Sequence, residues 1–198
     1  MSTQRLFGAG ALRMCRIMRA ILTILIAPLL ACALATTAVA QTAKPPAKPA
    51  PAAAPGGPKS IGSFDDWQAA TYVEGGQTVC YAFVKARQSA PAIQGRGEAV
   101  LTVTHRPGLR DSVAFTAGFD YATGAEAEVA IDAAKIAFYT AKRSAFARDG
   151  HAVVVALGKA QKVSITSPHP QKTKVVDNFS PKGFGKAYEA IGKACPPK

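Results

Sequence analysis

The sequence of 198 residues lacks the residues and spacings that most enzyme sites require. It has only three histidines, and no Ser/His/Asp order, glycine-rich phosphate loop or metal-ligand cluster stands out. The histidines (His105, His151 and His169) have no ligand-like spacing with any cysteine, which argues against a zinc site. These absences predict a protein that is not an enzyme and needs no cofactor and no metal.

Acidic residues are also absent from the N-terminus, where the first is Asp65. Several arginines precede an uncharged run from Ala20 to Ala40 that ends in small residues. This pattern predicts a signal peptide over residues 1–40, cleaved before Gln41. Two alternatives stay open. One is an uncleaved membrane anchor, because about 20 apolar residues span a bilayer. The other is a lipoprotein in which Cys32, in the run LLAC, is acylated. With cleavage of either kind, we expect the protein in the periplasm or cell envelope.

Cysteine is scarce outside this segment. Of the four cysteines, Cys15 and Cys32 belong to the export segment, which leaves Cys80 and Cys195. Two cysteines in an oxidising compartment predict one disulfide. Two free thiols, or a reactive or metal-binding thiol, are the alternatives, but neither a partner base nor further ligands are evident.

The mature chain divides into a linker and one domain. Residues 41–60 are rich in proline and alanine and have no large apolar residue before the end, so we expect a disordered linker. Residues 61–198 have the composition of a single globular domain. Eight short runs of strand-like alternation follow one another there, separated by turn residues, and they predict an all-β sandwich or barrel. The runs are DWQAATYV, TVCYAFVKA, EAVLTVTH, DSVAFTAGF, EAEVAI, KIAFYT, KVSITS and TKVVDNF.

A helix is expected at the C-terminal end. Apolar residues from Phe184 to Cys195 recur on one helical face, and Ser180 before Pro181 predicts the N-cap. The strand that contains Cys80 is apolar on both faces, so we expect it to be central and covered on both sides. A disulfide would then fix the helix to that strand. Residues 150–160 fit either a helix or a strand.

Charge is distributed unevenly along the domain. Between Ile61 and Asp132 there are nine acidic and five basic residues, whereas from Ala133 to Lys198 there are three acidic and twelve basic. The expected anion-binding residues are Lys142, Arg143, Arg148, Lys172, Lys174, Lys182 and Lys186. They predict attachment to an anionic surface such as lipopolysaccharide, phospholipid headgroups or a glycan. The alternative is a basic face that only aids solubility. Nucleic acid is not expected as a partner, because aromatic residues do not alternate with the basic ones at strand spacing.

The order of motifs resembles the invasion-associated locus B family of exported alphaproteobacterial proteins. The resemblance rests on FDDWQAATY, TVCYAFVKA, RGEAVLTVTHRPG, VAFTAGFDYATGAEAEVAI and FSPKGFGKAYEAIGKAC, which together span about Ile61 to Cys195. It implies an immunoglobulin-like β-sandwich of about eight short strands with a C-terminal helix. It also implies an envelope location, a link to host-cell invasion and no accepted catalytic site. The segments TAKRSAFARDG and SPHPQKTK depart from the family's pattern.

These observations favour an exported, non-enzymatic interaction or ligand-binding module with an envelope or host-surface partner. The alternatives are a small periplasmic hydrolase or accessory enzyme, and a structural envelope lipoprotein. A pocket that joins His105 to Asp65, Asp66 or Asp111 would favour the enzyme. We expect His105 and Arg106 to begin a turn, and the alternative is that this pair contacts an anion.

Overall fold

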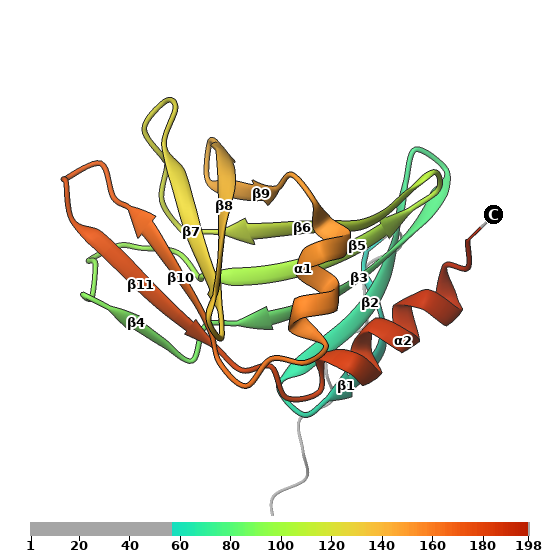
Figure 1. The fold of residues 1–198 in the computed structure, drawn as a ribbon. Coiled ribbons are helices and arrows are strands. Elements are labelled where there is room, and N and C mark those ends of the chain that lie inside the picture. The colour runs from blue at the N-terminus through green and yellow to red at the C-terminus, as the bar shows by residue number, and fades with distance from the viewer. Residues whose placement is uncertain (1–56, 198) are drawn as a thin grey trace, which may run out of the picture. The chain divides into compact units, whose positions relative to one another are not determined.

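The computed structural model describes residues 57–197, so the predicted signal peptide, Cys32 and most of the linker lie outside the described residues. Eleven strands and two helices form the described part of the chain (Figure 1). The strands are β1 (Lys59–Phe64), β2 (Trp67–Glu74), β3 (Gln77–Lys85), β4 (Gln88–Ala90), β5 (Val100–Arg106), β6 (Leu109–Thr116), β7 (Glu126–Ile131), β8 (Ala134–Ala141), β9 (Ser144–Ala147), β10 (Val163–Pro168) and β11 (Lys174–Phe179). The helices are α1 (Gly150–Leu157) and α2 (Phe184–Ala194).

All strands pair into one continuous antiparallel sheet, in the order β1-β2-β3-β5-β6-β9-β8-β7-β10-β11-β4. The predicted all-β class with a C-terminal helix is confirmed, and each of the eight expected runs forms a strand. The structure adds β1, β4 and β9, of which β1 and β4 are the two edges of the sheet. These three had no clear signal because β4 and β9 are very short and β1 is mostly exposed.

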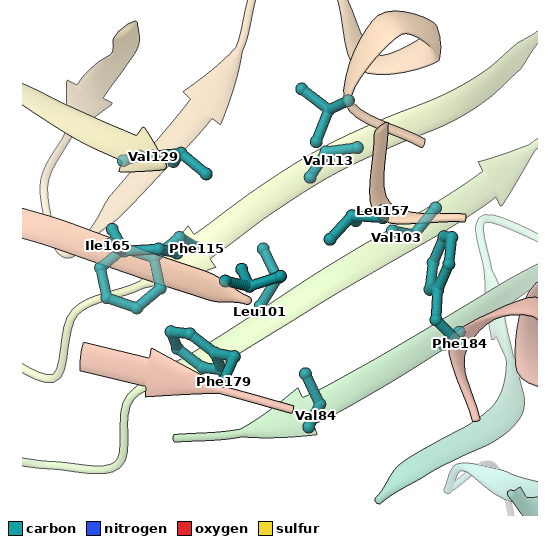
Figure 2. Packing of buried hydrophobic residues seen from close by; sticks show 14 of the residues in the cluster. Val84, Leu101, Val103, Val113, Phe115, Val129, Leu157, Ile165, Phe179 and Phe184 are labelled. Atoms are coloured by element: carbon teal, nitrogen blue, oxygen red, sulfur yellow. The ribbon is translucent and has the colours of Figure 1, made fainter. Parts of the chain in front are cut away.

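The sheet folds over on itself, so that strands β2, β3, β5 and β6 face β7, β10 and β11 (Figure 1). Side chains from both halves meet in one hydrophobic core. Figure 2 shows Leu101 and Phe115 pointing toward Ile165 and Phe179, and the rings of Phe115 and Phe179 are 5.9 Å apart edge to face. Because two layers of side chains meet in this way, the single sheet encloses a core as the two sheets of a sandwich do.

Strand β3 is central, as expected, but its two faces are not equally covered. Cys80, Ala82 and Val84 are fully buried under α2 and the core. On the other face Tyr81 and Phe83 are only half-buried and stack at 5.7 Å between ring centroids. Val79, on this same face, is buried, so the expected cover is present at that end of the strand and partial beside Tyr81 and Phe83.

The segment with two open interpretations forms helix α1. Asp149 caps its N-terminus by accepting a hydrogen bond from the Ala152 backbone N–H at 2.9 Å. Val153 and Leu157 are buried against the sheet, one turn apart. Gly150 is required at the start, because a Cβ there would clash with the carbonyl oxygen of Asp111 in β6. The cap and the buried turn together decide between strand and helix.

Helix α2 begins three residues later than the sequence predicts. Its N-cap is Gly183, with φ of 89°, and the backbone passes so close to the carbonyl of Phe64 that no Cβ fits. Ser180 is not the cap; its hydroxyl donates to Asp66 Oδ2 at 2.6 Å instead. The expected apolar face is otherwise present, and Phe184 packs edge to face on Trp67 at 4.8 Å. None of the described helices is both long and apolar enough to cross a bilayer.

Candidate anion-binding site

The disulfide between Cys80 and Cys195 is present, with 6.0 Å between the two Cα atoms. Cys80 is fully buried in β3, and Cys195 is the C-cap of α2. Helix α2 contacts β1, β2, β3 and β5. The bridge therefore holds the end of this helix on the small-residue face of the central strand, as the sequence predicts.

The seven basic residues expected to bind anions fall into separate groups. Lys142 and Arg143 lie in the β8–β9 turn, which contacts the loop after β6. The Lys142 carbonyl oxygen accepts from the Tyr121 backbone N–H at 2.8 Å, and Arg143 Nη2 donates to the Gly118 carbonyl oxygen at 2.8 Å. Lys172 and Lys174 lie at the β10–β11 turn, which contacts the same loop through His169 and Phe119, with 4.7 Å between ring centroids. These four form the first group.

The remaining three cations are placed differently. Arg148 is paired with Glu126 at 3.0 Å and lies over the ring of Tyr139. Lys182 and Lys186 follow the opposite end of β11, whose six residues extend roughly 20 Å. Figure 1 shows the β10–β11 turn and α2 on opposite sides of the domain. The seven residues thus do not form one surface, and whether either group binds an anion stays a prediction.

One of these cations, Lys182, lines a cavity of about 430 Å³. Its walls are Arg87, Ala160–Val163 and Asn178–Lys182. We call this cavity the lysine cleft. It exists because β11 ends beside the start of β10, and the Arg87 backbone N–H donates to the carbonyl of Asn178 at 2.9 Å. Three cationic residues, Arg87, Lys162 and Lys182, therefore line one cavity. They come from the β3–β4, α1–β10 and β11–α2 connections.

Arg87 in the lysine cleft is neutralised. Its Nη2 donates to Asp66 Oδ2 at 2.5 Å, and Asp66 also accepts from Ser180. The hydrogen bond from Arg87, followed by that from Ser180, lowers the pKa of Asp66 below its usual 3.8, so the pair stays ionised at neutral pH.

The two lysines of the cleft have no carboxylate within ion-pair distance among residues 57–197. Asp132 lies at the margin, but its carboxylate accepts from the backbone N–H groups of Gln161 and Lys162. Ammonium groups beside the amides of Gln161 and Asn178 suit the oxygens of a phosphate, sulfate or carboxylate group. Arg87 is not among the residues that the sequence predicts to bind anions, because it lies in the acidic half of the sequence.

His105 and Asp111 are the strongest candidates for catalytic chemistry in the described range. Asp111 is buried, has φ of 54°, and accepts from the Tyr188 hydroxyl at 2.7 Å. Its other oxygen lies 2.8 Å from Nδ1 of the exposed His151. The Asp111 backbone N–H donates to His105 Nδ1 at 3.3 Å, which places the proton of the neutral ring on Nε2. Nε2 is the only buried side-chain nitrogen or oxygen without a partner in the described structure.

The pKa values of this cluster follow from burial and hydrogen bonding. Burial, and then the nearby charge of Arg110, lower the pKa of His105 below its usual 6.5. Burial raises the pKa of Asp111, but the hydrogen bonds from His151 and Tyr188 outweigh it and bring the pKa below 3.8. Burial, with the hydrogen bond to Asp111, raises the pKa of Tyr188 to about 12.

Asp111 in this cluster links β6 to His151 of α1 and to Tyr188 of α2. Neither His105 nor Asp111 lines the lysine cleft or the larger cavity beside the disulfide. Asp65 and Asp66 belong to the β1–β2 turn, and Asp66 pairs with Arg87 and not with His105. The pocket that would favour an enzyme is thus not formed by these groups. Among the described residues, no three histidine, cysteine or carboxylate side chains are arranged to hold a metal ion.

Comparisons with known proteins agree with the motifs. Residues 67–192 match the family model described as "Invasion associated locus B (IalB) protein". Among solved structures, the crystal structure of invasion associated protein B from Bartonella henselae is 15% identical, with a TM-score of 0.49. The alignment covers 69% of this chain and 96% of that one. No curated protein matched the chain. Because the family model spans more than half of the 198 residues, the chain belongs to the invasion-associated locus B family.

Proposed function

We propose that this member of the invasion-associated locus B family is an exported, non-enzymatic binding module that attaches to an anionic surface through the lysine cleft. The partner is an envelope or host-surface component that displays phosphate, sulfate or carboxylate groups, such as lipopolysaccharide, phospholipid headgroups or a glycan. The observation that carries the proposal is that Lys162 and Lys182 line one cavity and that neither forms an ion pair with a carboxylate of the described residues 57–197.

The geometry supports binding more than catalysis. The cleft contains amide, hydroxyl and ammonium groups but no histidine or cysteine that could act as a base or nucleophile. Export is supported by the N-terminal sequence pattern and by the disulfide, which persists in oxidising compartments. With cleavage before Gln41, the linker of residues 41–60 becomes a spacer ahead of the domain.

The test is binding to immobilised heparin and to vesicles containing an anionic lipid, from low to high salt. The wild-type protein should bind at low salt and be released by ~1 M salt, because exposed charges more than about 8 Å apart are screened at physiological salt. Lys162→Glu/Lys182→Glu should abolish retention. The control, Lys172→Glu/Lys174→Glu, changes the net charge equally at the opposite end of β11 and should retain most binding.

Three outcomes would contradict the proposal. Absence of binding at low salt would mean that the basic residues only aid solubility. Equal loss in both double variants would mean that overall charge, and not the lysine cleft, attracts the surface. Binding that persists at ~1 M salt would indicate a recognition mode that does not depend on these ammonium groups.

A further inference from the structure

A second cavity lies beside the disulfide and is separate from the lysine cleft. It has a volume of about 580 Å³, within the range of about 300–1,000 Å³ that is usual for small-molecule pockets. Three segments line it: Gly76–Thr78 at the start of β3, Arg106–Gly108 with Arg110 where β5 turns into β6, and Ala194–Pro197 at the end of α2. We call it the arginine pocket.

The two arginines of this pocket are in different electrostatic states. Arg106 Nε donates to Glu74 at 3.0 Å and its Nη2 lies 3.3 Å from the Tyr72 hydroxyl, so its charge is compensated. Arg110 donates from Nη1 to the carbonyl oxygen of Cys195 at 2.6 Å. Over residues 57–197, no carboxylate lies within ion-pair distance of Arg110.

Arg110 is half-buried, so part of its hydration is lost without a compensating negative charge. A guanidinium in this state gains more from an anion than one in open water, because removal from water weakens its solvation and strengthens its attraction to a counter-charge. Its planar set of donors also fits two oxygens of a carboxylate or phosphate at once. Arg110 therefore marks the polar end of the pocket.

Another part of the lining is apolar. Cys195 contributes its disulfide, and Pro107, Pro196 and Pro197 have no backbone N–H. These groups favour the burial of hydrocarbon, while Gln77 and Thr78 add polar side chains elsewhere in the lining. The pocket thus combines one uncompensated guanidinium with an apolar surface.

We propose that the arginine pocket binds a small amphipathic anion, with a carboxylate or phosphate group on Arg110 and an apolar body against Cys195 and the prolines. The pocket depends on the disulfide, since the wall after α2 is fixed by the Cys80–Cys195 bond and by the Arg110 hydrogen bond to Cys195. The ligand is chemically different from the extended anionic surface proposed for the lysine cleft.

Calorimetric titration of the purified protein with octanoate, octyl phosphate and 1-octanol tests this. Octanoate or octyl phosphate, or both, should bind at least about tenfold more tightly than 1-octanol, because only they reach Arg110 with a charge. The stronger of the two identifies the headgroup. Amide resonances of Gln77, Gly108 and Ala194 should shift on binding, whereas those at the lysine cleft should not.

Arg110→Gln is the informative variant, because glutamine keeps a donor for the Cys195 carbonyl and removes the charge. It should weaken binding of the charged probe by about tenfold and leave 1-octanol unchanged. Lys172→Gln, at the distant β10–β11 turn, is the matched control and should have no effect. Lys162→Glu/Lys182→Glu should also leave octanoate binding intact, which separates this site from the proposed function.

Thr78→Trp, which fills the cavity from β3, should abolish binding of all three probes. The proposal is overturned if no charged probe binds, or if 1-octanol binds as tightly as the charged probes. It is also overturned if Arg110→Gln weakens charged and uncharged probes equally, since Arg110 would then only support the wall. Shifts confined to other surfaces would overturn it as well.

Discussion

The domain contains two buried polar clusters that differ in how completely their groups are paired. Arg96 and Asp177 form a two-fold ion pair at 2.7 and 2.8 Å, with side chains 6% and 0% exposed. Ser89 donates to Asp177 and Arg96 Nε donates to the carbonyl of Ala117, so the pair is fully bonded. In the other cluster, His105 Nε2 has no partner, and Asp111 depends on one exposed and one half-buried donor.

This difference suggests two ways to hold a folded-over sheet together. Asp177 comes from β11 and Arg96 from the loop before β5, so their pair joins the two halves through two hydrogen bonds between buried charged groups. Asp111 joins both helices to β6 through groups of which one, His105, titrates below neutrality. The second cluster also has the disulfide next to it, because Cys80 is the register partner of His105. We infer that a covalent bond compensates for the weaker polar cluster.

Removal of the disulfide should have the largest effect, because it takes away the covalent bond beside the cluster of His105 and Asp111. Closure of a loop across 115 positions contributes on the order of 4–5 kcal/mol in chain-entropy models. Cys80→Ser and Cys195→Ser should each lower the free energy of unfolding by about this amount, measured by urea denaturation. The double variant should be no less stable than either single one, because both residues share one bond. Additive losses would show that the two cysteines act independently.

Breaking the ion pair should cost nearly as much. Asp177→Ala leaves the guanidinium of Arg96 buried without a partner, which costs about 3–5 kcal/mol in comparable sites. The double variant Arg96→Met/Asp177→Leu should recover most of the loss, because apolar side chains of similar volume replace a buried pair at little cost. A loss below about 1 kcal/mol for Asp177→Ala would mean that Arg96 finds water or another acceptor.

The two clusters also differ in what the sequence could predict. The eight strands, the helix after Phe184 and the disulfide could be predicted because apolar period and cysteine count are local properties of the chain. The pairing of Arg96 with Asp177 spans 81 positions and has no local signal. The alternation in β11 even places Asp177 on the apolar face with Val175 and Phe179, where a carboxylate is unexpected without its partner.

The candidate sites were predictable only in part, for the same reason. Lys182 was expected to bind anions, but Arg87 and Lys162 join it only through the convergence of β3, β10 and β11. The predicted start of α2 was wrong. The Ser180 hydroxyl donates to Asp66, more than 100 positions away, and accepts from the Lys182 backbone N–H, but the helix begins only after Gly183. The number of charges along the chain does not show which cations lie far apart in the fold. Lys174 and Lys182 are close in sequence but lie at opposite ends of β11.

A smaller change sharpens the comparison within the weaker cluster. Tyr188→Phe removes the hydroxyl that donates to Asp111 and should destabilise the domain by about 1.5 kcal/mol, at the lower end for a bond to a charged group because Tyr188 is half-buried. Tyr72→Phe is the matched control, since its hydroxyl has only two long contacts, to Glu74 at 3.4 Å and from Arg106 at 3.3 Å, and its effect should be smaller. Equal effects of the two variants in urea denaturation would assign no special role to Asp111.

The smallest expected effect is a dependence on pH that only the His105 cluster should show. The pKa of His105 is lowered in the folded protein, so the unfolded chain takes up a proton first as the pH falls below 6.5. Stability from this residue is therefore complete above pH 6.5 and decreases as the pH falls toward the lowered value. Asp111 acts in the same direction only below 3.8, and Tyr188 stays protonated throughout because its pKa is about 12.

Urea midpoints between pH 7.5 and 5.0 should thus decrease for the wild-type protein and for Asp177→Ala alike. In His105→Gln, which cannot titrate, the midpoint should be lower at pH 7.5 but should change less on acidification. The charge of Arg110 faces the His105 ring, as do Asp111 and Tyr188. Asp111 and Tyr188 keep their charge state in this interval, because the pKa of Asp111 is lowered below 3.8 and that of Tyr188 is raised to about 12. A slope that stays the same in His105→Gln as in the wild-type protein would show that another group causes the acid sensitivity.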